Sequence, residues 1–373
     1  MTEGGTKLLV PSESIEREVP PISPVFFNPA ASVNRDVSVA ITEAAAGASF
    51  CDGLAGIGAR GLRIAKEVSR EMDVTLVDFN GDALKVAKKA ARANGVLRQC
   101  TFICEEARTF LNSRYGRGER FDFVDIDPFG SPSPFLQAMV AATAGGGVVS
   151  ATATDTAALC GVYPLVSRRR YGATSLNNSF HHETGARILL NAIRRHAAAT
   201  DRGVVPIAAH STKHYIRVYA RIEDGAKRAD EALDCEGYVT VCSKCSHAAA
   251  AAFPGDACDR CGGGLRWAGP LWVGTLTDRD VLGRAKEAAI RRGFREAART
   301  LDSLSSVNSF PPWSFSLEEI CSRLGVATVS GAKVGTFLRD AGFASGRQPF
   351  EKTGLKTDAP YSAVVDAVRS LTG

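Results

Sequence analysis

The chain has 373 residues, of which 45% are hydrophobic and 23% charged, and its formal net charge is +5. At about 100–200 residues per domain, this length predicts two or three domains with enough apolar material for packed cores. The chain contains no run of about 18 apolar residues, which excludes ordinary membrane spans. Residues 1–24 are polar and lack the basic-then-apolar layout of a signal peptide, so we expect a cytoplasmic protein without a membrane partner.

Basic residues occur in short clusters, at 168–171, 194–195 and 291–292. Clustered arginine favours a phosphate-bearing partner, although a charged run is more often a solvated face. Charge alone therefore leaves nucleic acid as an open alternative.

After an extended, Pro-rich lead-in, the first predicted helix follows the segment VFFNPAASVNRD. Asn28-Pro29 marks a turn, and Asn34 is a candidate cap for a helix that begins at about Asp36. Arg35 is unfavourable at the positive end of a helix dipole, which indicates that it serves another purpose.

Residues 49–93 predict a strand (49–54), a glycine-rich turn, a helix (60–71), a strand (74–78) and a helix (80–93). Asp52 ends the first strand and Asp78 the second, and the turn contains Gly53, Gly56, Gly58 and Gly61. Glycines of this kind let the backbone approach a nucleotide, and an acid at the second strand end can accept the ribose hydroxyls.

The position of Asp52 helps to identify the nucleotide. A carboxylate directly before the turn would repel the pyrophosphate of a dinucleotide such as NAD, but it would attract an ammonium group. S-adenosyl-L-methionine has an ammonium, a sulfonium and a ribose but no phosphate, so the sequence favours it as the ligand.

The third strand-helix unit, CTFICEEARTFL, places Glu106 and Ala107 at a strand end where an adenine edge can be recognised. A solvated loop with a helix cap explains the same residues equally well. These two interpretations remain open.

The stretch FDFVDIDPFGSPSPF predicts a buried strand that stops at Pro128, which has no N–H for a sheet ladder. Asp127 and the Pro128 carbonyl can accept the N–H groups of a flat amine-bearing ring, while Phe129 stacks on that ring. The alternative is a helix-capping Asp with a core Phe. A fifth strand follows, and Thr152, Thr154 and Asp155 at its end either line the target pocket or satisfy loop backbone.

A helix at 181–199 and two strands, 204–211 and 214–223, complete a predicted doubly wound sheet with an antiparallel pair. The histidines of this region form no ligand pattern, so we interpret each as structural or surface. They are His181, His182, His210 and His214.

Residues 234–273 contain two CxxC pairs separated by 12 residues. Four thiolates at this spacing predict a tetrahedral zinc ribbon, and because no position stays open the zinc would be structural. The predicted ligands are Cys242, Cys245, Cys258 and Cys261, and His247 is a poorer candidate.

The remainder predicts a basic helix at 277–301 and then a small helix-turn-helix domain with a wing-like tail. A helical dimerisation module is the competing interpretation of this tail. Basic and aromatic residues there are candidates for contacts with phosphates and bases. They are Arg339, Arg347, Lys352, Lys356, Phe343 and Phe350.

The chain resembles the archaeal tRNA (guanine(26)-N2)-dimethyltransferase family along nearly its whole length. The resemblance rests on FFNPAASVNRD, DGLAGIGARGLR, DFN at Asp78, FDFVDIDPFGSPSPF, SATATDTAALCG, RRYGA and PFEKTGLKTDAP. It implies transfer of methyl groups from S-adenosyl-L-methionine to the exocyclic amine of a guanine in tRNA. By motif, the donor site would comprise Arg35, Arg60 or Arg63, Asp78, Glu106 and Ala107, beside the glycine turn.

The same resemblance implies that Asp127, Pro128 and Phe129 form the target site. In our hypothesis Asp127 orients the amine or takes its proton, and Phe129 stacks on the flipped base together with Phe27. The alternatives are a class I amine methyltransferase acting on another nucleic acid or on protein, and a binding protein that has lost its chemistry.

The expected fold is α/β, a class I, Rossmann-like methyltransferase sheet with a zinc-ribbon insertion and a winged-helix-like C-terminal domain. The expected boundaries are a lead-in (1–24), a methyltransferase domain (25–233), a zinc ribbon (234–275) and a tRNA-binding domain (276–373). We expect a monomer.

Overall fold

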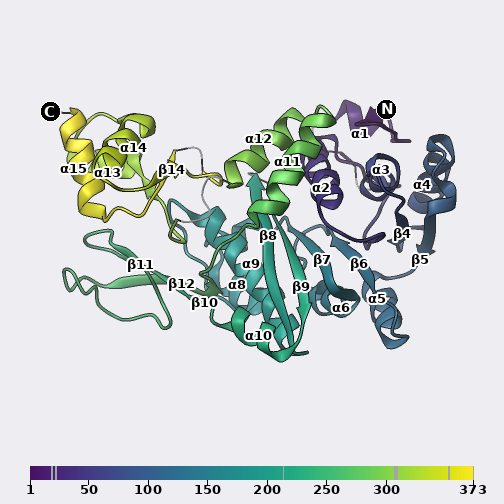
Figure 1. The fold of residues 1–373 in the computed structure, drawn as a ribbon, viewed down its shortest axis with the longest axis horizontal. Coiled ribbons are helices and arrows are strands. Elements are labelled where there is room, and N and C mark those ends of the chain that lie inside the picture. The colour runs from purple at the N-terminus through teal and green to yellow at the C-terminus, as the bar shows by residue number, and fades with distance from the viewer. Residues whose placement is uncertain (18–19, 22, 213, 306–309, 352, 373) are drawn as a thin grey trace.

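The computed structural model describes residues 1–17, 20–21, 23–212, 214–305, 310–351 and 353–372. A seven-stranded sheet of order β5-β4-β3-β6-β7-β9-β8 forms its centre (Figure 1). The strands are β3 (Ser49–Asp52), β4 (Asp73–Asp78), β5 (Cys100–Cys104), β6 (Phe121–Ile126), β7 (Thr143–Ala153), β8 (Arg202–Thr212) and β9 (Tyr215–Asp224). Strand β9 runs antiparallel to both β7 and β8, and the other neighbouring pairs are parallel, which confirms the predicted α/β sheet.

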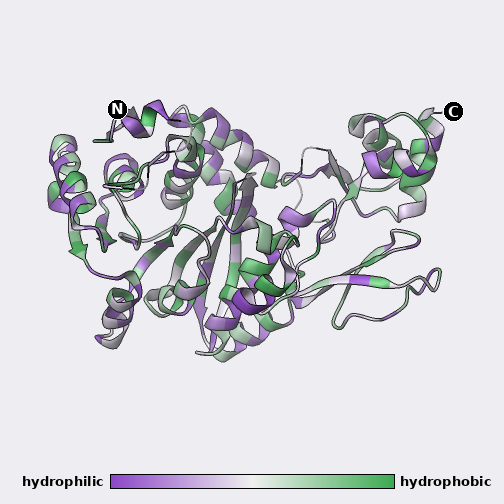
Figure 2. Ribbon diagram, turned by 180° about the vertical axis from the view of Figure 1, so that it is seen from behind, coloured by the Kyte–Doolittle hydropathy of each residue, from purple (hydrophilic) through white to green (hydrophobic). Residues whose placement is uncertain are grey.

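Helices cover both faces of this sheet, and a separate apolar core fills each side. One face carries α2 (Ser32–Ala44), α3 (Ala59–Glu67), α4 (Gly81–Asn94), α11 (Arg279–Arg291) and α12 (Arg295–Ser305). The other carries α5 (Ala107–Gly116), α6 (Leu136–Ala141), α7 (Thr156–Leu159), α8 (Pro164–Tyr171), α9 (His181–Ala198) and α10 (Ala226–Leu233). Figure 2 shows hydrophilic and hydrophobic segments alternating along these helices, as expected where one side of each helix is buried.

Short elements connect the sheet and the helices. These are the 3-10 turns at Pro29–Ala31, Leu97–Gln99 and Ser133–Phe135. Among the described residues, no helix combines the length and the hydropathy that a bilayer crossing requires.

The N-terminal segment differs from the predicted extended lead-in. It forms a hairpin of β1 (Thr2–Glu3) and β2 (Thr6–Lys7), followed by α1 (Glu13–Glu16). The hairpin is held because the buried Glu3 carboxylate bonds arginines of α2 and α3. The first long helix also begins earlier than predicted, at Ser32, and Asn28 caps the 3-10 turn before it by accepting from Ala30 N at 2.9 Å.

The basic helix predicted at 277–301 is two helices in the structure. The chain breaks between α11 and α12 at Gly293, whose φ of 73° belongs to the left-handed region that favours glycine. Both pieces pack on α2, so the break bends an amphipathic segment around the core.

Two smaller units lie at the end of the molecule opposite the N-terminus (Figure 1). The cysteine-rich segment forms an antiparallel sheet of β10 (Glu236–Cys242), β11 (Ala248–Ala251) and β12 (Leu265–Trp272). The C-terminal segment has its own core and comprises β13 (Phe315–Ser316), α13 (Leu317–Leu324), α14 (Gly331–Asp340), β14 (Ser345–Arg347), β15 (Gly354–Thr357) and α15 (Tyr361–Thr372).

A buried ion-pair cluster joins the C-terminal segment to α9. Lys356 of β15 lies 2.7 Å from Glu183 of α9, and Arg187 bonds the same carboxylate at 2.7 Å. Although burial opposes ionisation, Lys356 and Arg187 lower the pKa of Glu183 to about 2. Lys356 is only 2% exposed, so the prediction that it contacts phosphates is wrong. Lys352, predicted for the same role, lies outside the described residues.

We expect Glu183→Gln to destabilise the protein by about 3–5 kcal/mol, because it leaves Lys356 and Arg187 buried without a counter-charge. The measurement is the urea midpoint of unfolding at neutral pH, with the exposed Glu318→Gln as the matched control.

The same pair predicts a pH dependence. The pKa of Glu183 is lowered in the folded state. Its ionised carboxylate therefore contributes fully to the free energy of unfolding above the ordinary pKa of 4.5, and this contribution is lost as the pH falls towards 2. The stability difference between wild type and Glu183→Gln should therefore shrink over that interval. Equal midpoints at neutral pH would contradict a stabilising role for this carboxylate.

Candidate functional site

Three acids end adjacent strands at the carboxyl edge of the sheet. Strand β3 lies between β4 and β6, at the point where the strand order changes direction. Asp52 ends β3, Asp78 ends β4, and Asp127 follows β6 directly. The crevice at such a switch point is where open α/β sheets bind ligands, so these predicted residues come together at one edge.

The glycine turn after β3 holds two of these acids through its backbone. Gly56 N donates to Asp78 Oδ2 at 2.7 Å, and Gly61 N donates to Asp52 Oδ2 at 3.0 Å. Gly56 and Gly58 have φ values of 54° and 77°, and a Cβ on Gly58 would lie 2.8 Å from Leu76 Cδ2. The turn therefore requires glycine both for its conformation and for its close contact with β4.

Asp52 is a buried carboxylate beside a second one. It is 3% exposed, and in the strand register it lies opposite Asp125 of β6. Burial and the Asp125 carboxylate raise the pKa of Asp52 to about 7, although Arg60 opposes the shift. A bound cation at this position would lower that pKa and favour the ionised form.

Behind Asp127 lies an ion-pair network that the sequence did not predict. Asp125, 1% exposed, pairs with Arg217 of β9 and lies 3.2 Å from Arg60 Nε. Arg60 also donates to Asp127 Oδ2. Burial opposes ionisation of Asp127, but Arg60 and Arg217 outweigh it and hold the pKa of that carboxyl below its ordinary value.

Neutral side chains from other elements complete this network. Arg217 is fully buried and donates to Tyr219 Oη at 2.8 Å and to Thr152 Oγ1. Arg60 donates to Asn34 Oδ1 at 3.0 Å. The network therefore fixes Arg60 from α2, β6 and β9 at once. The available sequence signals were Asp125 inside an apolar strand and an arginine inside the alternating strand 214–223.

Arg35 and Arg63 are engaged away from Asp127. Arg35 Nε and Arg63 Nη1 both donate to Glu3 Oε1, at 2.6 and 2.9 Å. Arg63 is fully buried and also pairs with Asp36 at 2.7 Å and with Glu67 at 2.9 Å. Of the two arginines named for α3, Arg60 is therefore the one that reaches the strand-end acids.

Glu106 caps α5, and Ala107 is the first residue of that helix. Glu106 accepts from Thr109 N at 3.0 Å and from Arg108 Nε at 2.9 Å. The helix-cap interpretation thus describes the Glu106 side chain, while Ala107 begins α5 three residues after β5 ends.

The aromatic residues at the edge differ from those predicted. Phe129 is 62% exposed beside Asp127, as expected for a stacking platform. Phe27, predicted as its partner, is 2% exposed and packs under the Arg35 guanidinium at 4.9 Å. Phe26 instead contacts Phe129, with ring centroids 4.6 Å apart. The prediction for Phe27 is corrected because a buried ring has no face for a ligand.

Phe79 is a second exposed ring that sequence analysis missed. It follows Asp78 directly and is 77% exposed. Its position in the quoted motif DFN, directly after the strand-end acid, was the available signal.

The loop after Phe129 is fixed by the end of β7. Gly130 N donates to Thr154 Oγ1 at 2.6 Å, and Thr154 N donates to Gly130 O at 2.8 Å. Asp155 accepts from Tyr171 Oη at 2.6 Å. Of the two interpretations of Thr154 and Asp155, backbone and loop support is the one that the structure favours.

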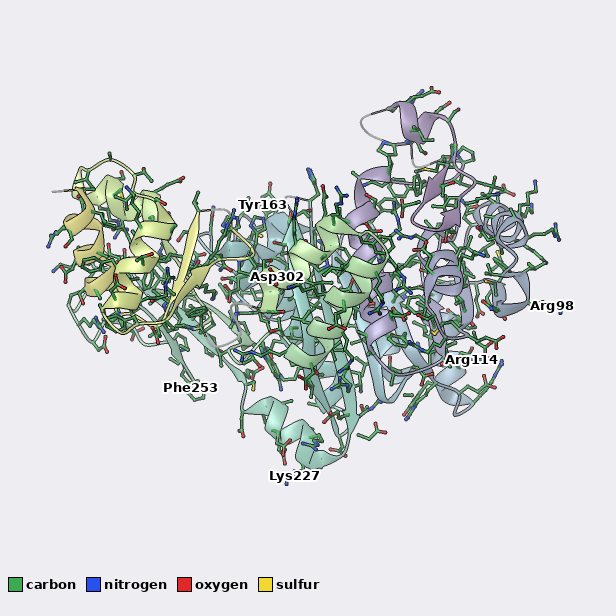
Figure 3. All side chains as sticks on the ribbon, turned by 45° about the horizontal axis from the view of Figure 1, so that its top comes forward. Arg98, Arg114, Tyr163, Lys227, Phe253 and Asp302 are labelled. Carbon is green, nitrogen blue, oxygen red and sulfur yellow. The ribbon has the colours of Figure 1, made fainter. Side chains whose placement is uncertain are left out.

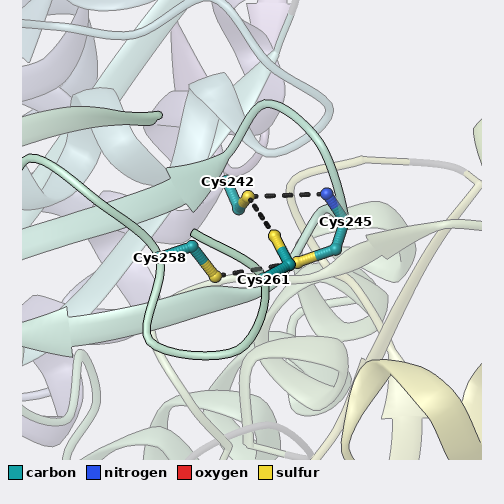
Figure 4. Close-up of side chains that lie close together, drawn as sticks. All are labelled: Cys242, Cys245, Cys258 and Cys261. Atoms are coloured by element: carbon teal, nitrogen blue, oxygen red, sulfur yellow. Dashed lines mark hydrogen bonds between the residues drawn. The ribbon is translucent and has the colours of Figure 1, made fainter. Parts of the chain in front are cut away.

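The four CxxC thiols converge in the protruding sheet (Figure 4). Their sulfur atoms all lie within 4.8 Å of one another, with Cys242–Cys261 at 3.5 Å and Cys245–Cys258 at 3.7 Å. Lys244 N and Cys245 N both lie 3.4 Å from Cys242 Sγ. This cage of thiols with N–H donors fits the ligand set of a structural zinc site.

Known proteins resemble this chain along nearly its whole length. A model of the family described as "N2,N2-dimethylguanosine tRNA methyltransferase" matches residues 4–369. The chain is 37% identical over 379 residues to a tRNA (guanine(26)-N(2))-dimethyltransferase of Methanopyrus kandleri, covering all of this chain and 98% of the relative. It is 32% identical to the Methanosarcina acetivorans protein of the same name, covering all of this chain and 99% of that one.

A solved structure agrees with these relatives. Trm1 from Pyrococcus horikoshii, in complex with S-adenosyl-L-methionine, superposes with a TM-score of 0.86 at 29% identity and covers 98% of both chains. The matches in sequence and in fold both extend over nearly the whole chain, including the strands that end in the three acids. The chain belongs to the N2,N2-dimethylguanosine tRNA methyltransferase family.

Proposed function

We propose that this protein transfers methyl groups from S-adenosyl-L-methionine to the exocyclic N2 of guanosine 26 in tRNA, giving N2,N2-dimethylguanosine. The observation that carries the proposal is the pairing of an exposed ring, Phe129, with an ionised acid, Asp127, beside the buried acids of the glycine turn. Relatives that carry this activity by name match the whole chain.

The residues at the edge fit the methyl donor in chemistry. Asp52 is a buried acid with a raised pKa, and a nearby cation, such as the donor's ammonium, would stabilise its ionised form. Asp78 accepts hydrogen bonds from two backbone N–H groups, and its oxygens keep further lone pairs that can accept ribose hydroxyls. Phe79 offers a ring face for the adenine. We assign Gly56 and Gly58 to backbone approach and Ala107 to the adenine edge.

Arginines and the Glu106 cap support the donor site from behind. Arg60 fixes Asp127, whereas Arg35 and Arg63 hold the hairpin through Glu3. Their role in donor binding is therefore to position α2 and α3 around the glycine turn. Glu106 acts through the start of α5, which it caps.

The donor supplies an electrophilic methyl group, and the residues of this chain prepare the amine. The guanine N2 lone pair is delocalised into the ring, so the amine is a weak nucleophile. Asp127 and the Pro128 carbonyl accept its two hydrogens and turn the lone pair towards the donor site. Because Arg60 holds Asp127 ionised, orientation is its first role and proton acceptance, directly or through water, its second.

Phe129 and Phe26 hold the flipped base. Stacking on an exposed ring contributes about 1–3 kcal/mol per base, and the edge contact of Phe26 keeps the Phe129 ring in place. One N–H remains after the first transfer, so the same acceptors can orient the amine for the second.

We assign the remaining parts of the chain as follows. Residues 1–24 are an N-terminal lead-in whose hairpin braces α2 and α3 through Glu3, 25–233 form the methyltransferase domain, 234–275 form a zinc ribbon and 276–373 bind tRNA. The helix pair α13–α14 followed by the β14–β15 hairpin supports a winged-helix-like assignment. Arg339 and Arg347 line a groove of about 520 Å³ there, and both are candidates for phosphate contacts.

Exposed aromatic residues also occur outside the C-terminal segment. Tyr163 and Phe253, labelled in Figure 3, are 59% and 82% exposed. Rings in such positions suit stacking on unpaired bases of a folded RNA.

The proposed function predicts that the protein, given labelled donor and unfractionated tRNA, produces N2-methylated and N2,N2-dimethylated guanosine on nucleoside analysis. Methylation of DNA or of protein amines, with unmodified tRNA, would replace the proposal by the alternative substrate class. Absence of any methyl transfer, with donor binding intact, would indicate a binding protein.

We expect Asp127→Ala to retain donor binding while turnover falls about 10²–10⁴-fold, because the amine loses its acceptor and its base. Calorimetry measures the affinity for the donor, and single-turnover methylation measures the rate of methyl transfer. Asp127→Asn separates the two roles, since an amide oxygen still orients the amine but takes no proton. The exposed Asp82→Ala is the matched control, and normal turnover of Asp127→Ala would refute the assignment.

Asp52→Asn should weaken donor binding about 10–100-fold, the loss expected for a hydrogen bond to a charged group. In wild type the affinity should fall as the pH is lowered below about 7, because the pKa of Asp52 lies there and the protonated acid is neutral. The variant should show no such dependence. Parallel pH profiles for wild type and Asp52→Asn would remove Asp52 from the ammonium site.

The ribbon proposal predicts that Cys242→Ser with Cys258→Ser lowers both the zinc content and the melting temperature. Metal binding stabilises a site of this size only when the thiolates are present. Native mass spectrometry measures the bound metal. Wild-type protein that binds no zinc after zinc addition would contradict the ribbon.

A further inference from the structure

A second group of metal-ligating side chains lies outside the site and the ribbon. Cys160, His181 and His182 place their ligand atoms within 4.8 Å of one another. Cys160 directly follows α7 as its C-terminal cap, and the two histidines begin α9. Glu351, from the loop between β14 and β15, joins them, with its Oε1 2.5 Å from His182 Nδ1 and 3.9 Å from His181 Nε2.

We propose that Cys160, His181, His182 and Glu351 form a second metal site for a divalent ion of the zinc class. The sequence alone led us to interpret both histidines as structural or surface residues. Their partners come from segments about 20 and 170 positions away, so no local spacing marks the site.

The backbone is shaped to bring Cys160 to the start of α9. Gly161 has a φ of 87°, and a Cβ there would lie 2.1 Å from Asn177 N and 2.3 Å from the carbonyl carbon of Leu176. Any side chain at this position would push α7 away from the segment that leads into α9. The close approach therefore depends on the glycine.

The second ring nitrogen of His181 is oriented as in known metal sites. His181 Nδ1 lies 2.5 Å from the carbonyl oxygen of Asn178, and a carbonyl only accepts, so Nδ1 carries the proton. The lone pair of the neutral ring is then on Nε2, the atom nearer Glu351. A ligating histidine typically donates its other N–H in this manner, which fixes both tautomer and ring.

Charge and burial also fit a divalent ion. When the ion binds, the Cys160 thiol loses its proton; the thiolate and the Glu351 carboxylate then carry two negative charges, which one divalent cation neutralises, and the histidines are neutral ligands. Cys160 is 6% exposed, and the side chains of His181, His182 and Glu351 are 29%, 18% and 20% exposed. One sulfur, two nitrogens and one oxygen leave no open position, so the ion is structural.

The site lies where α7, α9 and the C-terminal segment meet. Helix α7 directly follows Thr154 and Asp155, which fix the loop after Phe129, and Glu351 belongs to the C-terminal segment. An ion here ties the target loop to the C-terminal domain. It supplements the Glu183–Lys356 pair at the same junction.

Metal stoichiometry tests the proposal. Zinc-loaded, desalted protein is analysed by elemental mass spectrometry, and Cys160→Ser should contain one zinc ion fewer per chain than wild type. The exposed Cys104→Ser, which has the same chemistry outside the cluster, should match wild type. The difference is one ion whether or not the ribbon binds zinc, so failure here is distinct from failure of the ribbon.

A second set of variants guards against misfolding of Cys160→Ser. His182→Ala should also lack one ion, and Glu351→Gln, in a partly exposed loop, should release one ion to a chelator at least tenfold faster than wild type. Circular dichroism verifies that each variant is folded. Wild-type stoichiometry in His182→Ala, together with unchanged release from Glu351→Gln, would overturn the proposal.

Discussion

The proposed site at the carboxyl edge of the sheet depends on one buried charge, the Asp125 carboxylate between Arg60 and Arg217. A carboxylate that is 1% exposed is stable only when it is paired, and here each oxygen faces a guanidinium. This arrangement fixes Arg60, which in turn fixes Asp127 at the strand end. Because Arg217 comes from β9 and Arg60 from α3, the position of Asp127 depends on elements that lie far apart in the sequence.

The acids of the edge have different environments and so different roles. Asp127 has strong positive neighbours, which keep its pKa low, whereas burial and Asp125 raise the pKa of Asp52 to about 7. Asp52 thus favours a ligand that brings its own positive charge, while Asp127 needs none. Asp78, bound by backbone N–H groups, presents oxygens for neutral hydroxyls. Three carboxylates on adjacent strands accordingly suit an ammonium, a ribose and an amine.

The parts beyond the sheet are attached by buried ion pairs as well as by apolar contacts. Glu3 joins the N-terminal hairpin to α2 and α3, and Glu183 joins the C-terminal segment to α9. A buried ion pair of this kind adds little net stability compared with apolar side chains. It does constrain the geometry, because a buried charge without its partner is strongly destabilising. They therefore suit a protein that must hold a base, a donor and a folded RNA in one fixed arrangement.

The sequence by itself determined the strand-helix alternation, the glycine turn, the acids at strand ends and the CxxC pairs, because periodicity, backbone conformation and short spacings are local properties. It assigned Phe27 to the base and 277–301 to one helix, and it missed Asp125, Arg217 and Phe79. Only the tertiary structure decided which ring is exposed, which arginine reaches Asp127 and that Cys160 meets His181, His182 and Glu351. Burial and the pairing of distant side chains arise when the sheet and its layers close, so no local pattern encodes them.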